Sequence, residues 1–272
     1  MVRQAHHEGF FDICAGAALT EDISKQTPST VPRQHRRPGL IGGMSWRSTE
    51  LYYRRLNQAV EERIGPHHSF RGMVWNLDYA DLIGPASAGR WTEVEDQLTQ
   101  AARELTAGGC DLVVLTAVTA HRFYDAVSKA AGRPVPHVLE GAAHALDGLG
   151  VGCAGILGTA TTCAVGFADH YLARGGRTLL RLDEDAQDAL DGLIQGALTV
   201  GDVIAEGRAH LDIAIRTLVR RGAEAVVLAC TELPLLLPLA TAPVPLLDCV
   251  ALHVDEICNL IVSLDHADPT GH

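Results

Sequence analysis

Cys230 is the side chain with the clearest capacity for chemistry. It follows the buried-strand pattern Ala225–Leu228 and precedes Thr231, Glu232 and Pro234. Thr231 as a cap and Pro234 in the first turn predict that a helix starts directly after the thiol. Unpaired N–H groups at a helix N-terminus lower a thiol pKa, so we expect a thiolate that removes a proton from carbon or attacks a carbonyl. The alternative is a buried, inert cysteine.

An internal repeat gives Cys230 a counterpart. Residues 109–117 and 222–230 each read as a helix end, a glycine, an acidic residue, a buried strand and a turn. The repeat predicts two related α/β halves that face each other. Ala117 and Cys230 take the same place in the two copies, just beyond the carboxyl end of a strand, where open α/β sheets bind ligands.

Two further loops follow predicted strands and carry small or hydroxyl residues. The loop at residues 42–46, Gly-Gly-Met-Ser-Trp, is either an anion cradle at a helix start or a plain strand–helix turn. Its glycine spacing is neither GxGxxG nor a P-loop, which argues against a nucleotide site. The loop at residues 158–162 offers Thr159, Thr161 and Thr162. These hydroxyls suit either a ligand carboxylate or simple helix capping.

Three polar residues elsewhere are weaker candidates. His121 follows the first copy of the repeat, and Asp248 and His253 lie near the C-terminus. Each suits either ligand orientation or an internal hydrogen bond. No HExxH or Cys/His cluster is present, so we predict no metal site. The absence of Gly-x-Ser-x-Gly disfavours a serine hydrolase.

Composition narrows the partners and the compartment. The chain has 272 residues and a net charge of −11, which argues against a nucleic-acid or anionic-membrane partner. No apolar run reaches the roughly 20 residues of a spanning helix. Seven cysteines at irregular spacing, without CxxC, favour reduced thiols in the cytoplasm. Residues 1–38 read as a flexible extension, with a possible short helix around residues 10–19.

From residue 39 onward, apolar strand patterns alternate with helical patterns. This alternation predicts parallel βαβ units and sheets covered on both faces. Strands are predicted at residues 40–41, 72–77, 112–115, 152–157, 225–228 and 245–247. Helices are predicted at residues 48–63, 92–107, 120–131, 139–149, 164–174, 183–198, 203–220 and 251–264.

Taken together, these residues resemble the aspartate/glutamate racemase family over about residues 39–262. The segment from Gly42 through Ser48, Tyr52 and Asn57 looks like the family's N-terminal signature. The remaining matching segments are Thr119-Ala120-His121, Leu157-Gly158-Thr159 with Thr162, Cys230-Thr231-Glu232 with Leu235-Leu236, and Asp248 with His253.

The resemblance implies two similar α/β domains with mainly parallel sheets and an active site in the interdomain cleft. We expect residues 39–137 plus 246–265 in the first domain and residues 138–245 in the second. The resemblance also implies a homodimer, no pyridoxal phosphate or other cofactor, and a small carboxylate or carbonyl substrate. The implied substrate-binding residues are Met44, Ser45, Thr119, Thr159, Thr161, Thr162 and Thr231, with His121, Glu232 and His253 in support.

The chain departs from the family at one catalytic position. Members usually place two cysteines on opposite faces of the substrate's α-carbon, but Ala117 stands where the first cysteine is expected. Val118 stands where the family has a carboxylate-binding Asn. Thr116 should point to the other face of its strand. A methyl group carries no exchangeable proton, so Cys230 remains as the sole thiol acid or base.

Several functions fit one thiol. The leading prediction is an isomerase-like or lyase-like enzyme of this family that moves a proton next to a carboxylate or carbonyl. Relatives that decarboxylate arylmalonates lack the first cysteine in a similar way. The alternatives are a racemase with a non-cysteine second base, a decarboxylase, lyase or cyclase, covalent catalysis with His121 as base, and a non-catalytic carboxylate-binding homologue. The apolar residues near the predicted pocket favour a substrate less polar than aspartate.

Overall fold

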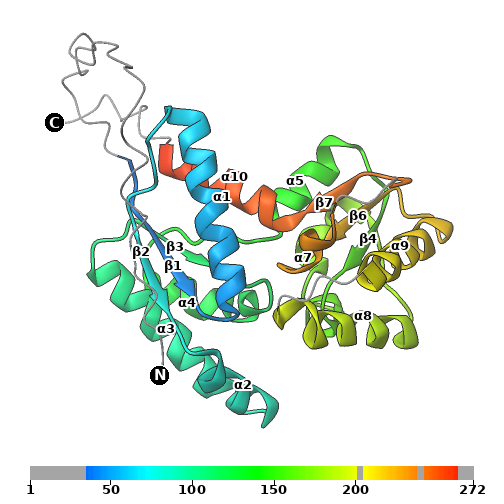
Figure 1. Cartoon of the computed structure of the whole chain (residues 1–272), viewed down its shortest axis with the longest axis horizontal. Coiled ribbons are helices and arrows are strands. Elements are labelled where there is room, and N and C mark those ends of the chain that lie inside the picture. Colours follow the sequence, from blue (N-terminus) through cyan, green and yellow to red (C-terminus); the bar gives the residue numbers. More distant parts are fainter. Residues whose placement is uncertain (1–34, 201–204, 238–241, 263–272) are drawn as a thin grey trace, which may run out of the picture. The chain divides into compact units, whose positions relative to one another are not determined.

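Two parallel β-sheets form the framework of the computed structural model, which describes residues 35–200, 205–237 and 242–262 (Figure 1). The first sheet has the order β2-β1-β3 and the second the order β5-β4-β6-β7, and every pair is parallel. The strands are β1 (Pro38–Gly42), β2 (Met73–Asn76), β3 (Leu112–Leu115), β4 (Cys153–Leu157), β5 (Thr178–Leu180), β6 (Ala225–Leu228) and β7 (Leu246–Asp248). The predicted α/β class with parallel sheets is confirmed.

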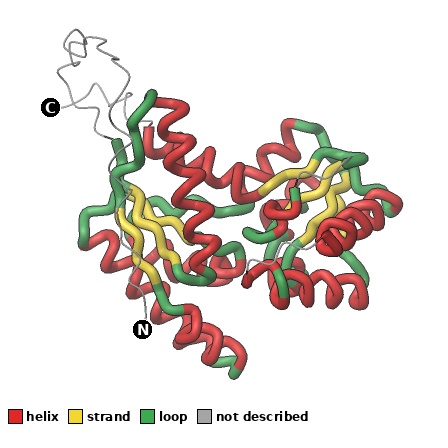
Figure 2. The backbone as a smooth tube through the Cα atoms, in the orientation of Figure 1, coloured by secondary structure: helices red, strands yellow, loops and turns green. Residues whose placement is uncertain are grey.

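Helices flank the strands of both sheets (Figure 2). The α-helices are α1 (Trp46–Ile64), α2 (Tyr79–Ser87), α3 (Trp91–Ala107), α4 (Tyr124–Ala131), α5 (Glu140–Gly148), α6 (Ala160–Cys163), α7 (Asp169–Leu172), α8 (Glu184–Gly196), α9 (Ala205–Arg220) and α10 (Cys249–Val262). Four 3-10 turns complete the description: η2 (Thr119–Phe123), η3 (Arg174–Gly176), η4 (Leu198–Val200) and η5 (Leu233–Leu236).

The central strands are apolar throughout because helices cover both of their faces. Every residue of β1, β3 and β6 is buried. One core cluster contains residues from both sheets, including Leu40, Val114, Ile156 and Val227. The loops at the ends of these strands are therefore anchored on a continuous apolar core.

The chain returns from the second sheet toward the first at β7 and α10. Strand β7 pairs with β6, while α10 packs against α1 and α5. Asp248 marks the junction. Its carboxylate accepts hydrogen bonds from the N–H groups of Val250 and Ala251 and pairs with Arg55 at 2.8 Å. The division into two domains at residues 137 and 246 remains a prediction.

The structure differs from the predicted elements in three places. Strand β5 was not predicted, because its run of three residues is too short to stand out as a strand. The predicted helix at residues 164–174 is wrong, because only α7 and the short η3 turn are helical there and Gly166 has a φ of 96°. Helix α2 was not predicted, because Gly84 and Pro85 disguise its helical pattern. The predicted helix at residues 10–19 and most of the predicted extension lie outside the described residues.

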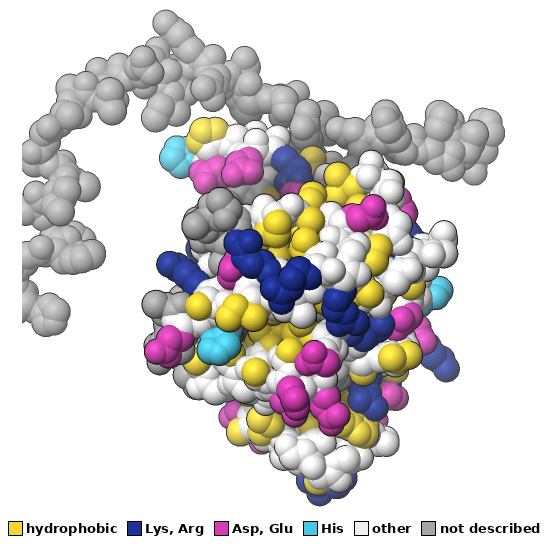
Figure 3. All heavy atoms as spheres, turned by 90° about the vertical axis from the view of Figure 1, so that its right-hand side faces the viewer, with side chains coloured by type: hydrophobic (Ala, Val, Ile, Leu, Met, Phe, Trp, Pro, Cys, Tyr) yellow, Lys and Arg dark blue, Asp and Glu magenta, His cyan; other side chains and the backbone are white. Residues whose placement is uncertain are grey.

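One face of the described part of the molecule carries both basic and acidic side chains. Basic and acidic side chains lie interspersed on the face that Figure 3 shows. On α9, for example, Arg216 pairs with Asp212 at 2.7 Å. None of the helices within the described ranges combines the length and the apolar character needed to cross a membrane.

Candidate active site

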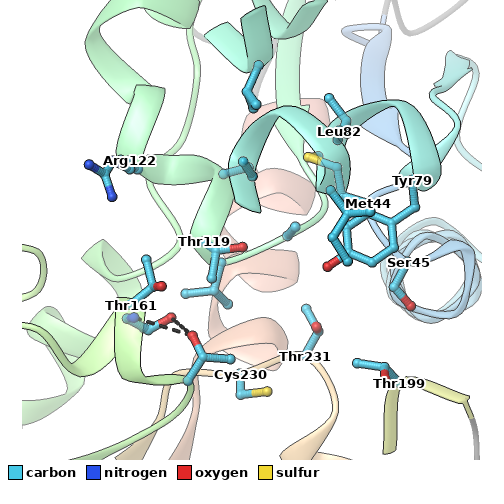
Figure 4. A pocket seen from close by; sticks show the side chains of 18 of the residues that line it. Met44, Ser45, Tyr79, Leu82, Thr119, Arg122, Thr161, Thr199, Cys230 and Thr231 are labelled. Atoms are coloured by element: carbon cyan, nitrogen blue, oxygen red, sulfur yellow. Dashed lines mark hydrogen bonds between the residues drawn. The ribbon is translucent and has the colours of Figure 1, made fainter. Parts of the chain in front are cut away.

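A cavity of about 400 Å³ lies where the loops after β1, β3, β4 and β6 converge (Figure 4). Carboxyl ends of parallel strands are the expected place for a ligand site in such folds. Every residue predicted to bind substrate lines this cavity: Met44, Ser45, Thr119, Thr159, Thr161, Thr162 and Thr231. Ala117, Cys230 and Glu232 line it as well. Ala117 and Cys230, the last positions of the two copies of the internal repeat, therefore line the same cavity.

Cys230 lies in the loop between β6 and η5 and is buried, with 3% of its surface exposed. Its Sγ lies 3.3 Å from Oε2 of Glu232 and donates a hydrogen bond to it. Burial, and then the negative charge of Glu232, raise the pKa of this thiol well above its ordinary value. Hydrogen bonds from the N–H groups of Glu232 and Leu233 act in the opposite direction but are the smaller influence.

The predicted lowering of the Cys230 pKa is therefore wrong for the free protein. The helix that follows is only the four-residue 3-10 turn η5, whose dipole is small. Thr231 does not cap it; its hydroxyl donates to the carboxylate of Glu232 instead. The resting side chain is a protonated thiol beside a carboxylate.

Glu232 is a buried carboxylate with a free oxygen. Glu232 is 7% exposed, and its Oε2 accepts hydrogen bonds from both Cys230 and Thr231. Among the described residues, none donates to Oε1 or pairs with the carboxylate as a cation. A buried charge without a counter-ion is costly, so this oxygen is available to a donor on a ligand.

The cavity lining is apolar at Ala117 and Val118, which are 5% and 4% exposed. Thr116 does not line the cavity. Its Oγ1 donates to the backbone oxygen of Ile41 at 3.0 Å, and the residue is fully buried. Thr116 directly follows β3, and its hydroxyl is bound to the backbone of Ile41 rather than presented to the cavity, as the sequence predicts.

The loop after β1 holds an unusual serine. Ser45 has a φ of 83°, which L-residues rarely adopt, and its Oγ is buried without a hydrogen-bond partner. Gly43 precedes it with a φ of 87°, and a Cβ there would lie 1.9 Å from the backbone oxygen of Leu77. The N–H of Gly43 donates to Oγ1 of Thr49 at 2.9 Å, so this amide is not available to an anion. Strain and an unsatisfied hydroxyl are typical of ligand-binding loops.

The threonine loop after β4 both caps a helix and lines the cavity. Thr159 accepts a hydrogen bond from the N–H of Thr162 at 3.3 Å, and their hydroxyls lie 3.0 Å apart, as the dashed lines in Figure 4 mark. Thr161 is exposed toward the cavity. The N–H of Ala160 is bound by Asp191 at 2.9 Å. Capping is thus confirmed, and hydroxyls remain at the cavity surface.

His121 and His253 lie outside the lining of this cavity. Nδ1 of His121 lies 3.0 Å from the backbone oxygen of Ala117, while Nε2 accepts from the N–H of Val138 at 3.3 Å. His121 is therefore neutral, with its proton on Nδ1. Burial lowers its pKa to about 4. Because both nitrogens are occupied, His121 is not placed to act as the base for covalent catalysis at Cys230.

His253 is held in the same manner. Its Nδ1 lies 2.9 Å from the hydroxyl of Tyr52 and its Nε2 lies 3.1 Å from the backbone oxygen of Pro136. Burial lowers the pKa of His253 to about 3. His137, which sequence reasoning did not select, stacks on Tyr171 at 3.8 Å, and burial lowers its pKa to about 2. Together these histidines hold the segment of residues 136–138 that joins the two sheets.

Sequence reasoning also missed the wall contributed by α2 and α3. Tyr79, Leu82, Ile83 and Trp91 line the cavity from these helices. Arg122, in η2, is the one cationic side chain among the described residues that line it. No sequence motif marks these positions, and only the apolar spacing of α3 hinted at a buried face. Among the described residues, no three His, Cys, Asp or Glu side chains form a metal-binding cluster.

Comparisons with known proteins agree on one family. A family model described as Asp/Glu/Hydantoin racemase matches residues 41–257, a range that contains all the loops of the cavity. A proposed Asp/Glu racemase from Yersinia pestis shares 29% identity and a TM-score of 0.77 over 84% of this chain and 99% of that one.

Two more distant structures support the fold alone. An aspartate racemase homologue from Pyrococcus horikoshii OT3 shares 22% identity, with a TM-score of 0.72, over 83% of this chain and 99% of that one. A glutamate racemase from Francisella tularensis subsp. tularensis SCHU S4, in complex with D-glutamate, shares 14% identity, with a TM-score of 0.57, over 88% and 85%.

Proposed function

Because the chain belongs to the Asp/Glu/Hydantoin racemase family, we propose that it catalyses cofactor-independent proton transfer at a carbon next to a carboxylate or carbonyl. Cys230 is the acid and base of this reaction. The observation that carries the proposal is that Cys230 is the one thiol, among the described residues, that lines the cavity. Cys163 directly follows Thr162 in the sequence but does not line the cavity, and burial raises its pKa to about 12.

The protonation state of Cys230 favours the acid role. A thiol whose pKa is raised by burial and by Glu232 is a proton donor at neutral pH. In the proposed step the electron pair of an enediolate takes the thiol proton, a C–H bond forms and the S–H bond breaks. The resulting thiolate is met by the N–H groups of Glu232 and Leu233. In the reverse direction the thiolate takes the α-proton.

Charge on the enediolate requires donors that are in place beforehand. The unsatisfied hydroxyl of Ser45 and the hydroxyls of Thr119 and Thr161 line the cavity and are suited to this role. Val118, which stands where the family has an Asn, supplies none. Thr119 and Thr161 form the proposed binding site for the substrate carboxylate, and Ser45, which Figure 4 places beside Met44 and Tyr79, is a proposed further donor from the loop after β1.

Because Ala117 cannot carry a proton, we expect proton transfer on only one face of the substrate carbon. A second proton carrier is missing at this position, and Thr116 is committed to the backbone of Ile41. We expect exchange of the α-proton without inversion, or protonation of one face after loss of a leaving group. A racemase with a non-cysteine second base is the second candidate, and it would be slower by about 10² to 10⁴-fold than a two-thiol enzyme.

The test is hydrogen–deuterium exchange in D₂O, followed by NMR, with a panel of amino acids and α-substituted acids. We expect loss of the α-proton signal with the configuration retained, and no exchange with Cys230→Ala. Cys163→Ala is the matched control and should exchange at the wild-type rate. Inversion at the rate of exchange would contradict the one-face mechanism. Binding without exchange by the wild type would instead support a non-catalytic homologue.

The oligomeric state and the compartment belong to the same proposal. We expect a homodimer in the cytoplasm. The edge strand β2 exposes Val74 and Trp75 at 42% and 40%, and the neighbouring α1 exposes Tyr53 at 53%. Exposed apolar edges of this kind are typical of interfaces. Light scattering should give twice the mass of one chain, and Trp75→Lys should yield monomers.

A further inference from the structure

The cavity has two chemically different ends. The loops after β4 and β6 supply hydroxyls, the thiol and the carboxylate of Glu232. In Figure 4, Leu82, Met44 and Tyr79 lie together across the cavity from Thr161 and Cys230. This second end is formed by α2, α3 and η2, and its apolar lining residues are Leu82, Ile83, Ala86, Val94, Leu98 and Phe123.

Most of the apolar end is formed by buried residues of the packed core. Leu82, Val94 and Leu98 are 4%, 7% and 0% exposed and belong to one core cluster. Phe123 belongs to the same cluster and lies 6.4 Å from the ring of Trp91. The apolar end therefore has a fixed shape, which a ligand group must fit.

The charges at this end do not suit a second carboxylate. Arg122 is the one cation among the described lining residues, and its guanidinium lies 4.4 Å from the centre of the Trp91 ring. In Figure 4 the guanidinium points away from Thr119 and Cys230. A carboxylate placed among Leu82, Val94 and Leu98 would lose its hydration without gaining a counter-ion, which is unfavourable.

We propose that the chamber between α2, α3 and η2 binds an uncharged alkyl or aryl substituent on the reacting carbon. This inference rests on the proposed function, because it places the reacting carbon beside Cys230. The substrate class is then α-substituted acids with one carboxylate at the hydroxyl end and an apolar side chain in the chamber. Glu232 Oε1, which accepts no hydrogen bond from the described residues, suits an ammonium or hydroxyl group on the same carbon.

The effect on affinity follows from burial. Removing one apolar side chain of this size from water is equivalent to about 10- to 100-fold in affinity. Calorimetric titration with three probes measures it: 3-phenylpropanoate, 4-methylpentanoate and succinate. We expect the two apolar carboxylates to bind at least about 10-fold more tightly than succinate.

Two variants change the chamber without touching the reacting end. Ile83→Arg places a cation at a residue that is 46% exposed and should weaken both apolar probes about 10-fold while tightening succinate. Ala86→Leu fills the chamber and should weaken 3-phenylpropanoate the most. Ile213→Arg is the matched control, because Ile213 is 61% exposed on α9 and outside the cavity lining; it should leave all three affinities unchanged.

The outcomes separate this inference from the proposed function. Equal or tighter binding of succinate by the wild type, or no binding of either apolar probe, overturns the inference. Apolar selectivity without any deuterium exchange overturns the proposed function and leaves the chamber in place. Exchange that is fastest with aspartate retains the proposed function and overturns the chamber.

Discussion

Sγ of Cys230 donates a hydrogen bond to Oε2 of Glu232 across 3.3 Å, and this pair sets the protonation state of the cavity. The carboxylate stabilises the thiol and opposes the thiolate. Burial acts in the same direction and is the larger influence on the pKa. A protonated thiol can donate its proton to a carbanion, but it is a poor nucleophile toward a carbonyl carbon.

The pair predicts a specific effect of Glu232→Gln on thiol reactivity. Removing the charge removes one cause of the raised pKa, so the alkylation rate of Cys230 by iodoacetamide should begin to rise at a lower pH than in the wild type. Mass spectrometry of the alkylated peptide across pH 6 to 11 measures the shift. Glu206→Gln removes an exposed charge from α9 and should leave the profile unchanged. Alkylation of the wild type that is already complete at neutral pH would contradict the raised pKa.

The Ala117→Cys variant tests whether a second proton carrier at this position allows reaction on the opposite face of the substrate carbon. A thiol at this position would project from the end of β3 into the same cavity as Cys230. Two positioned thiols can take and deliver the proton on opposite faces, so inversion should rise by about 10² to 10⁴-fold over the wild type. Chiral chromatography of a substrate that exchanges its α-proton measures the inversion. The double variant with Cys230→Ala is the control and should lose the gain. If inversion did not increase in the Ala117→Cys variant, we would conclude that residue 117 does not lie next to the reacting carbon.

Most of the strands and helices were predictable because their apolar residues follow simple periods, whereas the short edge strand β5 was not. The repeat at residues 109–117 and 222–230 also located Ala117 and Cys230, since parallel strands end at a common edge of a sheet. Residues that follow each strand by one or two positions were therefore the most reliable site predictions.

Features that depend on folding back of the chain were not predictable. Helix α2 was hidden by Gly84 and Pro85, so the apolar end of the cavity was missed. The state of Cys230 was also mistaken, because the pattern Cys-Thr-Glu does not reveal that Glu232 turns back onto the thiol. His137 showed no signal, since its stacking on Tyr171 joins residues 34 positions apart only in the folded chain.

Ser45→Ala should separate stability from binding. The buried Oγ of Ser45 has no hydrogen-bond partner, and an unsatisfied hydroxyl typically costs about 1–3 kcal/mol. Its removal should therefore leave the free energy of unfolding unchanged or raise it by up to about 1 kcal/mol. Affinity for a carboxylate probe should fall about 10-fold, because a donor to the ligand is lost.

Ser128→Ala supplies the matched control for this prediction. Ser128 on α4 also has a buried, unpartnered Oγ but lies outside the cavity lining. The two variants should change the urea midpoint in the same direction, and only Ser45→Ala should change the titration with the carboxylate. Equal affinities for both variants and the wild type would exclude Ser45 from the binding site.

The neutral histidines predict that acid destabilises the protein. In the unfolded chain a histidine titrates near pKa 6.5, whereas burial lowers the pKa of folded His121 to about 4. Between these two values the unfolded state binds a proton that the folded state does not, so the free energy of unfolding is full above pH 6.5 and falls as the pH drops. His121 alone contributes a loss on the order of 3 kcal/mol by pH 4. His253, with a pKa of about 3, extends the loss further.

Urea unfolding at pH values from 8 to 4 measures this loss. His253→Gln keeps groups that can meet Tyr52 and Pro136 but does not titrate, so its stability should fall less steeply below pH 6.5 than that of the wild type. A free energy of unfolding for the wild type that stays constant from pH 7.5 to 5 would show that these histidines are not buried in the neutral form.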